Sequence, residues 1–255
     1  MTIIQSIFLG IIQGITELLP VSSSGHLTLL QQYLHIESTP LFYDIFLHFA
    51  TLIAICWFFR EAILNIKQHR VIQLALASLP TLVIGFLFKD FLLSAFNSTL
   101  VVGIGLLFTA GFNFSTELIL KKNELLAPKE MKTHQSFYVG LWQTLALVPG
   151  VSRSGTTMFS ALLTGVNKKE ALEFSSLLSI PVILAVTAAE FLDHQHYSIV
   201  LENVPIYLVG AITAFFTSLL SLKLLCKLLD NKKFDWFGWY CLVIGCLVVI
   251  ENLFI

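Results

Sequence analysis

The segment "QSIFLGIIQGITELLPVSSSG" at residues 5–25 has a counterpart later in the chain. It aligns without gaps with "QSFYVGLWQTLALVPGVSRSG" at residues 135–155, and eight of the 21 positions are identical. None of these identities is a leucine, the residue in which chance matches concentrate in so apolar a chain. They are Gln5/Gln135, Ser6/Ser136, Gly10/Gly140, Gln13/Gln143, Val21/Val151, Ser22/Ser152, Ser24/Ser154 and Gly25/Gly155. The alignment predicts two related halves, 1–120 and 134–255.

The composition places the chain in a membrane. Of its 255 residues, 56% are hydrophobic and only 12% are charged, whereas a soluble domain usually carries about 25% charged residues. Apolar runs of about 20 residues, the length of a membrane-spanning helix, recur along the chain. The net charge of -1 gives no indication of nucleic-acid binding. We predict an all-α polytopic membrane protein with one integral-membrane domain over residues 1–255, and no removable signal peptide.

Two segments of the chain differ from simple spanning helices. Residues 1–36 and 134–166 each contain an apolar start, a break rich in Pro, Gly and Ser, and a second apolar run. The predicted spans are roughly 42–59, 72–90, 96–120, 171–192, 204–222 and 235–255. Residues 121–134 form a polar linker between the halves.

The lysine and arginine residues determine the expected topology. If both broken segments enter and leave the membrane on one side, thirteen basic residues lie on one face, and only Lys89 lies on the other. If the second segment crosses, the count becomes seven against seven, so the positive-inside rule favours the first arrangement. The thirteen are Arg60, Lys67, Arg70, Lys121, Lys122, Lys129, Lys132, Lys168, Lys169, Lys223, Lys227, Lys232 and Lys233.

This topology has six spans and two re-entrant hairpins, with both termini outside. Each half is a re-entrant helical hairpin followed by three transmembrane helices. Because three is an odd number of crossings, the halves form an inverted repeat, an arrangement that brings broken helices together near the midplane. We therefore expect a buried site where the breaks at 21–25 and 151–155 meet.

Arg153 is the one basic residue that no loop accounts for. An arginine inside a membrane costs about 2.5 kcal/mol or more and needs a partner. It is either an anion clamp suited to phosphate or half of a structural ion pair with Glu17. Gly150 and Gly155 allow close backbone approach, and a helix restarting after Gly155 would point free N–H groups at the same place.

Glu17 is the corresponding acid in the first half. Gln13 lies four residues earlier, so both side chains project from one helical face. Glu17 could orient water, assist a base or hold a divalent cation. His26 could take a proton from a serine or water, or attack phosphorus itself. Ser23 aligns with Arg153, so the halves share serines and differ at the reactive positions.

We therefore predict Glu17, Ser23, His26 and Arg153 as the catalytic residues. The residues predicted to bind the substrate are Gln13, Ser22, Ser24 and Gly25 in the first half, and Ser152, Ser154, Thr156 and Thr157 in the second. Asp44 and His48, four residues apart in a span, either line the cavity or mark a helix interface. Glu117, Glu190 and Glu251 fall near span ends, where we expect them to reach water.

Two motifs in this chain closely resemble those of a known family. "QGITELLPVSSSGH" at 13–26 and "PGVSRSGTT" at 149–157 are similar to the signature motifs of the bacterial undecaprenyl-diphosphate phosphatases, the bacitracin-resistance phosphatases. The resemblance implies a phosphatase of the bacterial inner (plasma) membrane with its active site on the outer side. It would hydrolyse undecaprenyl diphosphate to undecaprenyl phosphate and inorganic phosphate. That reaction recycles the lipid carrier of peptidoglycan synthesis and confers bacitracin resistance.

The resemblance also implies residue roles. Glu17 matches the second acid of the first motif, Ser23 and His26 match its reactive serine and histidine, and Ser152, Arg153 and Thr157 match the phosphate-binding motif. The first acid is often Glu, but here it is Gln13, which carries no charge. The family uses a divalent cation, Mg²⁺ or Ca²⁺; this sequence shows no complete metal site, although Glu17 and the diphosphate together could hold one.

Several alternatives stay open at the level of sequence. The nucleophile is Ser23, His26 or water, and the chain could form a homodimer among membrane lipids. A transporter or flippase of a lipid phosphate or other anion would also suit inverted repeats with a cationic midplane. A second superfamily of lipid phosphatases has a histidine six residues after its Ser-Arg pair; here that position is Phe159, so this match fails.

Overall fold

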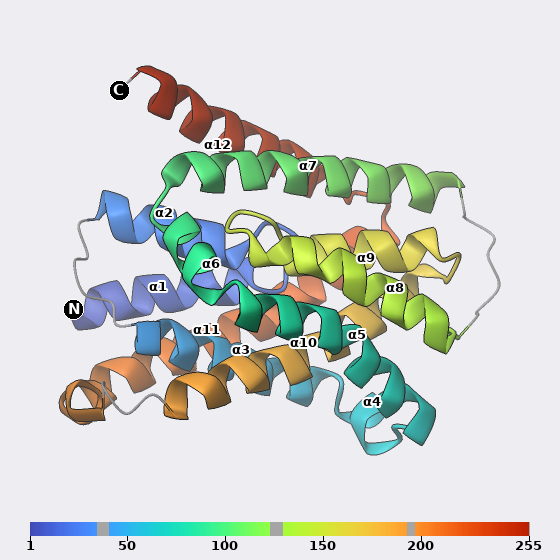
Figure 1. The fold of residues 1–255 in the computed structure, drawn as a ribbon, viewed down its shortest axis with the longest axis horizontal. Coiled ribbons are helices and arrows are strands. Elements are labelled where there is room, and N and C mark those ends of the chain that lie inside the picture. Colours follow the sequence, from blue (N-terminus) through green and yellow to red (C-terminus); the bar gives the residue numbers. More distant parts are fainter. Residues whose placement is uncertain (35–40, 123–129, 193–196, 255) are drawn as a thin grey trace.

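A computed structural model describes residues 1–34, 41–122, 130–192 and 197–254, with the backbone alone for 41–42, 189–192 and 197–203. All regular secondary structure in these residues is helical, as predicted (Figure 1). The helices are α1 (Ile3–Thr16), α2 (Ser23–Tyr33), α3 (Leu41–Phe58), α4 (Arg60–Leu64), α5 (Gln68–Leu87), α6 (Lys89–Phe96), α7 (Thr99–Lys122), α8 (Thr133–Gln143), the 3₁₀ turn η1 (Thr144–Leu147), α9 (Arg153–Leu163), α10 (Lys168–Leu192), α11 (Tyr197–Asp230) and α12 (Asp235–Phe254).

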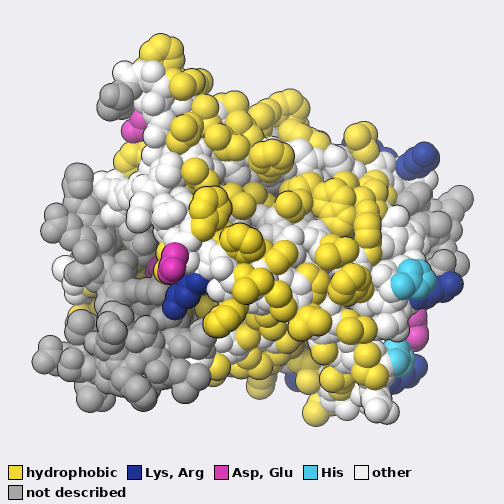
Figure 2. Space-filling model, in the orientation of Figure 1, with side chains coloured by type: hydrophobic (Ala, Val, Ile, Leu, Met, Phe, Trp, Pro, Cys, Tyr) yellow, Lys and Arg dark blue, Asp and Glu magenta, His cyan; other side chains and the backbone are white. Residues whose placement is uncertain are grey.

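Among the described residues, five helices are long and apolar enough to cross a membrane: α5, α7, α10, α11 and α12. They correspond to five of the six predicted spans. The remaining span, 42–59, is α3, which is apolar but shorter than the other five over its described residues. The chain is thus a multi-pass membrane protein. On the face shown in Figure 2, apolar side chains cover the middle and Lys and Arg gather at the right-hand end.

The two broken segments are helical hairpins, as their sequences predict. α1 ends at Thr16, and the chain turns back into α2 at Ser23. α8 and η1 lead to a second turn, and α9 runs back beside α8 (Figure 1). Pro20 and Pro149 cannot supply the N–H that a continuous helix requires. α9 begins at Arg153, before the restart predicted after Gly155, because the Ser152 hydroxyl accepts from Gly155 N (3.1 Å) and caps the helix there.

The two hairpins pack on the rest of the molecule in corresponding ways. α1 crosses α11 at Gly10, where an added Cβ would lie 2.4 Å from the Gly210 oxygen. α8 crosses α5 at Gly140, where an added Cβ would lie 2.3 Å from the Ala77 oxygen. Gly10 and Gly140 are one of the identical pairs in the alignment. Small residues let helix backbones approach closely inside membranes.

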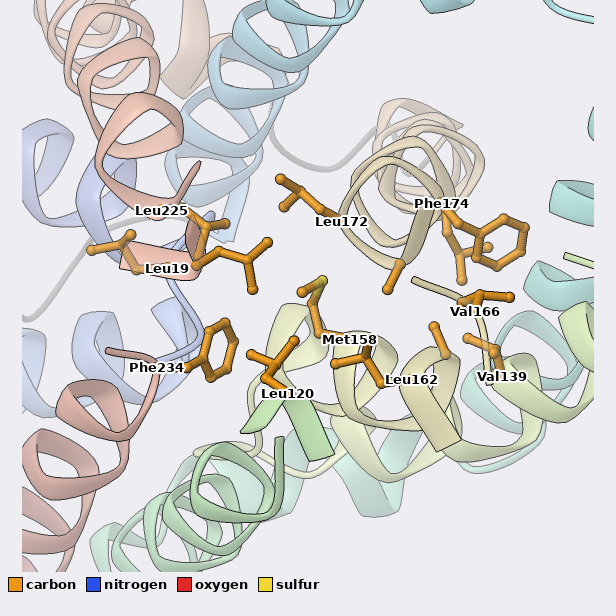
Figure 3. Packing of buried hydrophobic residues seen from close by; sticks show 14 of the residues in the cluster. Leu19, Leu120, Val139, Met158, Leu162, Val166, Leu172, Phe174, Leu225 and Phe234 are labelled. Carbon is orange, nitrogen blue, oxygen red and sulfur yellow. The ribbon is translucent and has the colours of Figure 1, made fainter. Parts of the chain in front are cut away.

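The largest buried cluster surrounds α9 and the turn of the first hairpin. Met158 lies near its middle, with Leu19, Leu120 and Leu162 around it (Figure 3). Because Leu19 belongs to the turn of the first hairpin and Met158 to the second, this apolar core joins the two hairpins. The breaks, and the polar residues they carry, are therefore fixed against each other inside the protein.

Basic residues gather where α3, α7 and α11 end and α10 begins, and ion pairs join them. Arg70 makes two 2.7 Å hydrogen bonds to the Glu170 carboxylate, and Lys168 lies 2.7 Å from Asp230. The two chain ends lie at the opposite end of the molecule (Figure 1). Lys129 is outside the described residues. We call the end with Arg70 and Lys168 the basic end.

The expectation that acids near span ends reach water is wrong for Glu117. That side chain is 2% exposed, accepts from Phe234 N (2.9 Å) and lies 3.1 Å from the Lys121 ammonium. It therefore fixes the start of α12 against α7. Glu251 accepts a hydrogen bond from the Tyr33 hydroxyl, and the side chain of Glu190 lies outside the described residues.

Candidate active site

The turns of the two hairpins meet inside the molecule, as the alignment predicts. The Ser154 hydroxyl donates to the Leu19 oxygen (3.2 Å). A Cβ added to Gly25 would lie 3.0 Å from Gly150 Cα, so the glycine at 25 permits this close approach. Gly150 has a φ of 90°, which favours glycine, and any Cβ there would meet the Val102 oxygen at 2.2 Å.

α7 holds both turns through two polar residues four positions apart. The Thr109 hydroxyl donates to the Gly150 oxygen (2.8 Å) and accepts from Ser152 N (2.8 Å). The Asn113 amide donates to the Pro20 oxygen (2.6 Å). Because Thr109 and Asn113 share one face of one helix, they fix the second turn and the first turn at a set separation.

Glu17 and Arg153 form an ion pair between the two turns. The distance from Arg153 Nη2 to Glu17 Oε1 is 2.6 Å, and the two side chains are 17% and 7% exposed. The Ser23 hydroxyl donates to the other oxygen of the carboxylate, Oε2, at 2.5 Å. Three of the four predicted catalytic residues therefore lie in one contact group, and the carboxylate binds the cation and the hydroxyl through different oxygens.

Gln13 and His48 complete the surroundings of Glu17. The Gln13 amide nitrogen lies 3.3 Å from Glu17 Oε2 and 2.9 Å from His48 Nδ1. His48 Nδ1 is itself 3.2 Å from Glu17 Oε2. The sequence left open whether Asp44 and His48 line a cavity. His48 does, whereas Asp44 accepts from the Gln31 amide (3.0 Å).

The remaining contacts of Arg153 come from α9 itself and from α10. Its Nη1 donates to the Ser175 oxygen (3.4 Å). The Thr157 hydroxyl donates to the Arg153 oxygen (2.8 Å) and lies 2.5 Å from the Ser175 hydroxyl. Thr157, predicted to bind substrate, thus braces the arginine against α10, while the guanidinium retains further N–H groups for an anion.

His26 is the predicted catalytic residue that does not join this group. Its Nδ1 lies 2.7 Å from the Ser22 oxygen, and its Nε2 lies 2.7 Å from the Tyr240 hydroxyl. The imidazole stacks on the Tyr240 ring, with 5.5 Å between the ring centres. These contacts join the first hairpin to α12.

The site opens into a cavity of about 180 Å³ that both polar and apolar side chains line. The predicted site residues that line it are Glu17, Ser22, Ser23, Ser24, Ser152 and Arg153, together with His48. The apolar residues of the lining include Ile45, Leu147, Val182, Ile183 and Val186. The other predicted residues lie outside the lining: Gln13, Gly25, His26, Ser154, Thr156 and Thr157 hold the turns and their neighbours.

The described residues do not fit a metal ion held by the protein alone. They contain no group of three or more His, Cys, Asp or Glu side chains that could hold one. Both oxygens of Glu17 already have partners, and one of these is the positively charged Arg153. A cation at this carboxylate would have to displace these contacts, so no step proposed below passes through a metal.

The comparisons with known proteins agree with this architecture. A model of the family described as bacitracin resistance protein BacA matches residues 6–247. The chain belongs to the bacitracin resistance protein BacA family. Three similar proteins, all named undecaprenyl-diphosphatase, come from Halothermothrix orenii, Methanococcus vannielii and Campylobacter hominis. In that order, they are 36%, 35% and 34% identical to this chain. The alignments cover 98%, 96% and 96% of this chain and 98%, 98% and 97% of the three relatives.

In this BacA family member, sequence reasoning missed the residues that hold the site from other helices. Thr109, Asn113 and Ser175 lie far along the chain from the two motifs, and Tyr240 lies in a run that resembles an interfacial aromatic belt. One signal was available for α7. A polar residue within a membrane span usually faces the protein interior, and Thr109 and Asn113 lie one helical turn apart in the run 96–120.

Proposed function

We propose that this protein is a membrane phosphatase that hydrolyses undecaprenyl diphosphate to undecaprenyl phosphate and inorganic phosphate. The observation that carries the proposal is the contact group of Glu17, Ser23 and Arg153 in the lining of a cavity that apolar side chains also line. A cation, a hydroxyl and its base suit a diphosphate, and the apolar lining residues suit a polyprenyl chain. Membership of the BacA family and relatives named undecaprenyl-diphosphatase support the same activity.

In the proposed reaction, Ser23 attacks the terminal phosphorus. The Ser23 O–H proton moves to Glu17 Oε2, a bond forms between Ser23 Oγ and phosphorus, and the bond from phosphorus to the bridging oxygen breaks. Undecaprenyl phosphate leaves with that oxygen. Water then attacks the phosphorus of the phosphoserine: a bond forms from the water oxygen to phosphorus, and the bond from phosphorus to Ser23 Oγ breaks. Glu17 returns its proton to Ser23 Oγ, and inorganic phosphate leaves with the water oxygen and both water protons. The 2.5 Å hydrogen bond favours Ser23 over a free water as the nucleophile.

Arg153 and the starts of two helices stabilise the charge of the phosphoryl group. Arginine binds phosphate through parallel N–H groups, and phosphoryl transfer depends mainly on positioning and charge stabilisation. α2 begins at Ser23 and α9 at Arg153. The first N–H groups of both helices therefore add positive potential at the same place.

We further propose that the two hairpins are re-entrant and that residues 1–120 and 134–255 form an inverted repeat. Three kinds of evidence support this: the alignment, the matching crossings at Gly10 and Gly140, and the position of both chain ends opposite the basic end. With α3 as the sixth span, the basic end faces the cytoplasm of a bacterial inner membrane. The site then opens to the outer face, where the released lipid monophosphate would re-enter the carrier cycle of peptidoglycan synthesis.

The test is phosphate release from purified undecaprenyl diphosphate in detergent, where transport cannot be scored. We expect release by the wild type and its loss in Glu17→Ala and Arg153→Ala. Arg60→Ala and Glu61→Ala, which remove exposed charges of the same kinds on α4, serve as controls. Melting curves establish that each variant is folded. A folded Glu17 or Arg153 variant with full activity would show that the site is wrong, and an inactive wild type would favour the transporter.

A further inference from the structure

The two histidines near the site lie in different surroundings. For His26, the Ser22 oxygen is a carbonyl and accepts only, so the ring must donate from Nδ1. The other ring nitrogen, Nε2, is taken up by the Tyr240 hydroxyl. The side chain is 8% exposed and absent from the cavity lining. Both ring nitrogens of His26 thus make hydrogen bonds to other parts of the protein, one within the first hairpin and one to α12.

The second hairpin makes the same hydrogen bond without a histidine. Thr156 aligns with His26, and its hydroxyl donates to the Ser152 oxygen at 2.8 Å. In both hairpins the side chain four residues after the capping serine bonds to that serine's oxygen. Ser22, unlike Ser152, has a positive φ of 69°, a conformation that a serine keeps only when its surroundings hold it. This comparison assigns position 26 a role in fixing the turn.

His48 has the opposite character. It lines the cavity, its side chain is 30% exposed, and its Nδ1 lies 3.2 Å from Glu17 Oε2. That oxygen is the one that accepts from Ser23. The neutral Gln13 amide lies 2.9 Å from the same Nδ1. An amide nitrogen only donates, so with the proton on Nδ1 the Gln13 amide donates to Glu17 Oε2 (3.3 Å) rather than to the imidazole.

We propose that His48 is the histidine that positions Glu17 toward Ser23, and that His26 fixes the turn at Ser22. This inference rests on the proposed function, since it assigns a role within that reaction. His48 donates from Nδ1 to Glu17 Oε2 and so sets the direction from which the carboxylate meets the Ser23 hydroxyl. It acts through Glu17 and is a positioning residue.

A matched pair of substitutions tests the role of His48. An asparagine amide can place its nitrogen where Nδ1 lies, whereas a glutamine amide reaches one carbon further. We expect His48→Gln to lower kcat at least about tenfold, which corresponds to one hydrogen bond to a charged group, with KM within about threefold of wild type. His48→Asn should retain most of kcat. Equal kcat values in the two variants would overturn the proposal.

A second pair tests the role of His26. His26→Thr introduces the residue of the second hairpin and can restore the bond to the Ser22 oxygen, whereas His26→Ala cannot. We expect kcat and the melting temperature to be higher in His26→Thr than in His26→Ala. If the two variants lose activity equally while the melting temperature recovers in His26→Thr, the imidazole of His26 takes part in the reaction and the assignment is wrong.

The pairing of His48 with Glu17 can be measured without substrate. In protein labelled with ¹⁵N in its histidine rings, Glu17→Gln should shift the His48 ring signals and leave those of His26 in place. The variants His48→Asn and His26→Thr identify the two sets of signals. If the wild type releases no phosphate, the proposed function fails, and this spectrum alone decides whether His48 is bound to Glu17. Unchanged His48 signals would refute the pairing.

Discussion

At the scale of single residues, the two oxygens of Glu17 have different neighbours. Oε1 faces the Arg153 guanidinium at 2.6 Å, and Oε2 accepts from the Ser23 hydroxyl at 2.5 Å. The carboxylate can therefore receive the serine proton without releasing the arginine. Removing one partner of such a buried pair typically costs about 3–5 kcal/mol, because a charge is left without compensation. The ion pair that the sequence offered as an alternative to an anion clamp thus exists, and it leaves other N–H groups of Arg153 available.

We expect Ser23→Ala to lower kcat for phosphate release at least about 100-fold, since a nucleophile or proton-transfer group usually contributes that much. Ser78→Ala is the matched control. Ser78 is equally buried, and its hydroxyl bonds only to the Leu74 oxygen within α5. Kinetics on both purified variants provide the measurement. A Ser23→Ala enzyme that keeps more than about a tenth of wild-type kcat would point to water as the nucleophile.

At the scale of helices, the position of each hairpin depends on close crossings. α1 lies on α11 at Gly10, and the Gly10 oxygen also lies 3.4 Å from the Thr217 hydroxyl. No hydrophobic driving force favours helix association within lipid, so tight packing has to supply the stability. Glu17 directly follows α1 as its C-cap residue, and a shift of α1 would therefore move the carboxylate away from Arg153.

Gly10→Ala should destabilise the protein by about 1–3 kcal/mol, the usual cost of overpacking. Its added Cβ would lie 2.4 Å from the Gly210 oxygen, which is backbone and cannot rotate away. We expect a melting temperature lower by about 3–10 °C in detergent. Gly111→Ala on α7, where an added Cβ meets nothing within 4 Å, is the control and should melt at or above the wild-type temperature. Equal melting temperatures would mean that α1 and α11 can separate at no cost.

At the scale of the whole molecule, charge and the hairpins together define an orientation. Basic residues are joined by ion pairs at one end, and both chain ends lie at the other (Figure 1). A hairpin whose two arms open at the same end of the molecule adds no membrane crossing. The spans before and after it therefore run in the same directions as they would without the hairpin. The first hairpin opens toward the chain ends, and the second opens toward the basic end. Their turns consequently meet between the two ends.

The orientation can be tested with reporter fusions in the full-length chain. We expect a green fluorescent protein fused after Ile255 to be dark and an alkaline phosphatase at the same position to be active, because the proposed topology places that terminus on the outer side. A fluorescent protein inserted between Lys122 and Glu130 should be bright. Fluorescence from the fusion at Ile255 would reverse the orientation and place the opening of the site on the cytoplasmic side.

The sequence by itself determined the class of fold, the two broken segments and the pairing of their turns. These follow from local properties: the length of apolar runs, the missing N–H of Pro20 and Pro149, and the expense of Glu17 and Arg153 within a membrane. Only the tertiary structure decided which histidine meets Glu17. His26 and His48 both lie near the first motif, and their surroundings depend on how α3 and α12 pack. His26 hydrogen-bonds to Tyr240 of α12, whereas His48 of α3 lines the cavity. The contact of His26 with Tyr240 joins residues 214 positions apart, and His48 comes from a different helix than Glu17, so no local pattern encodes these contacts.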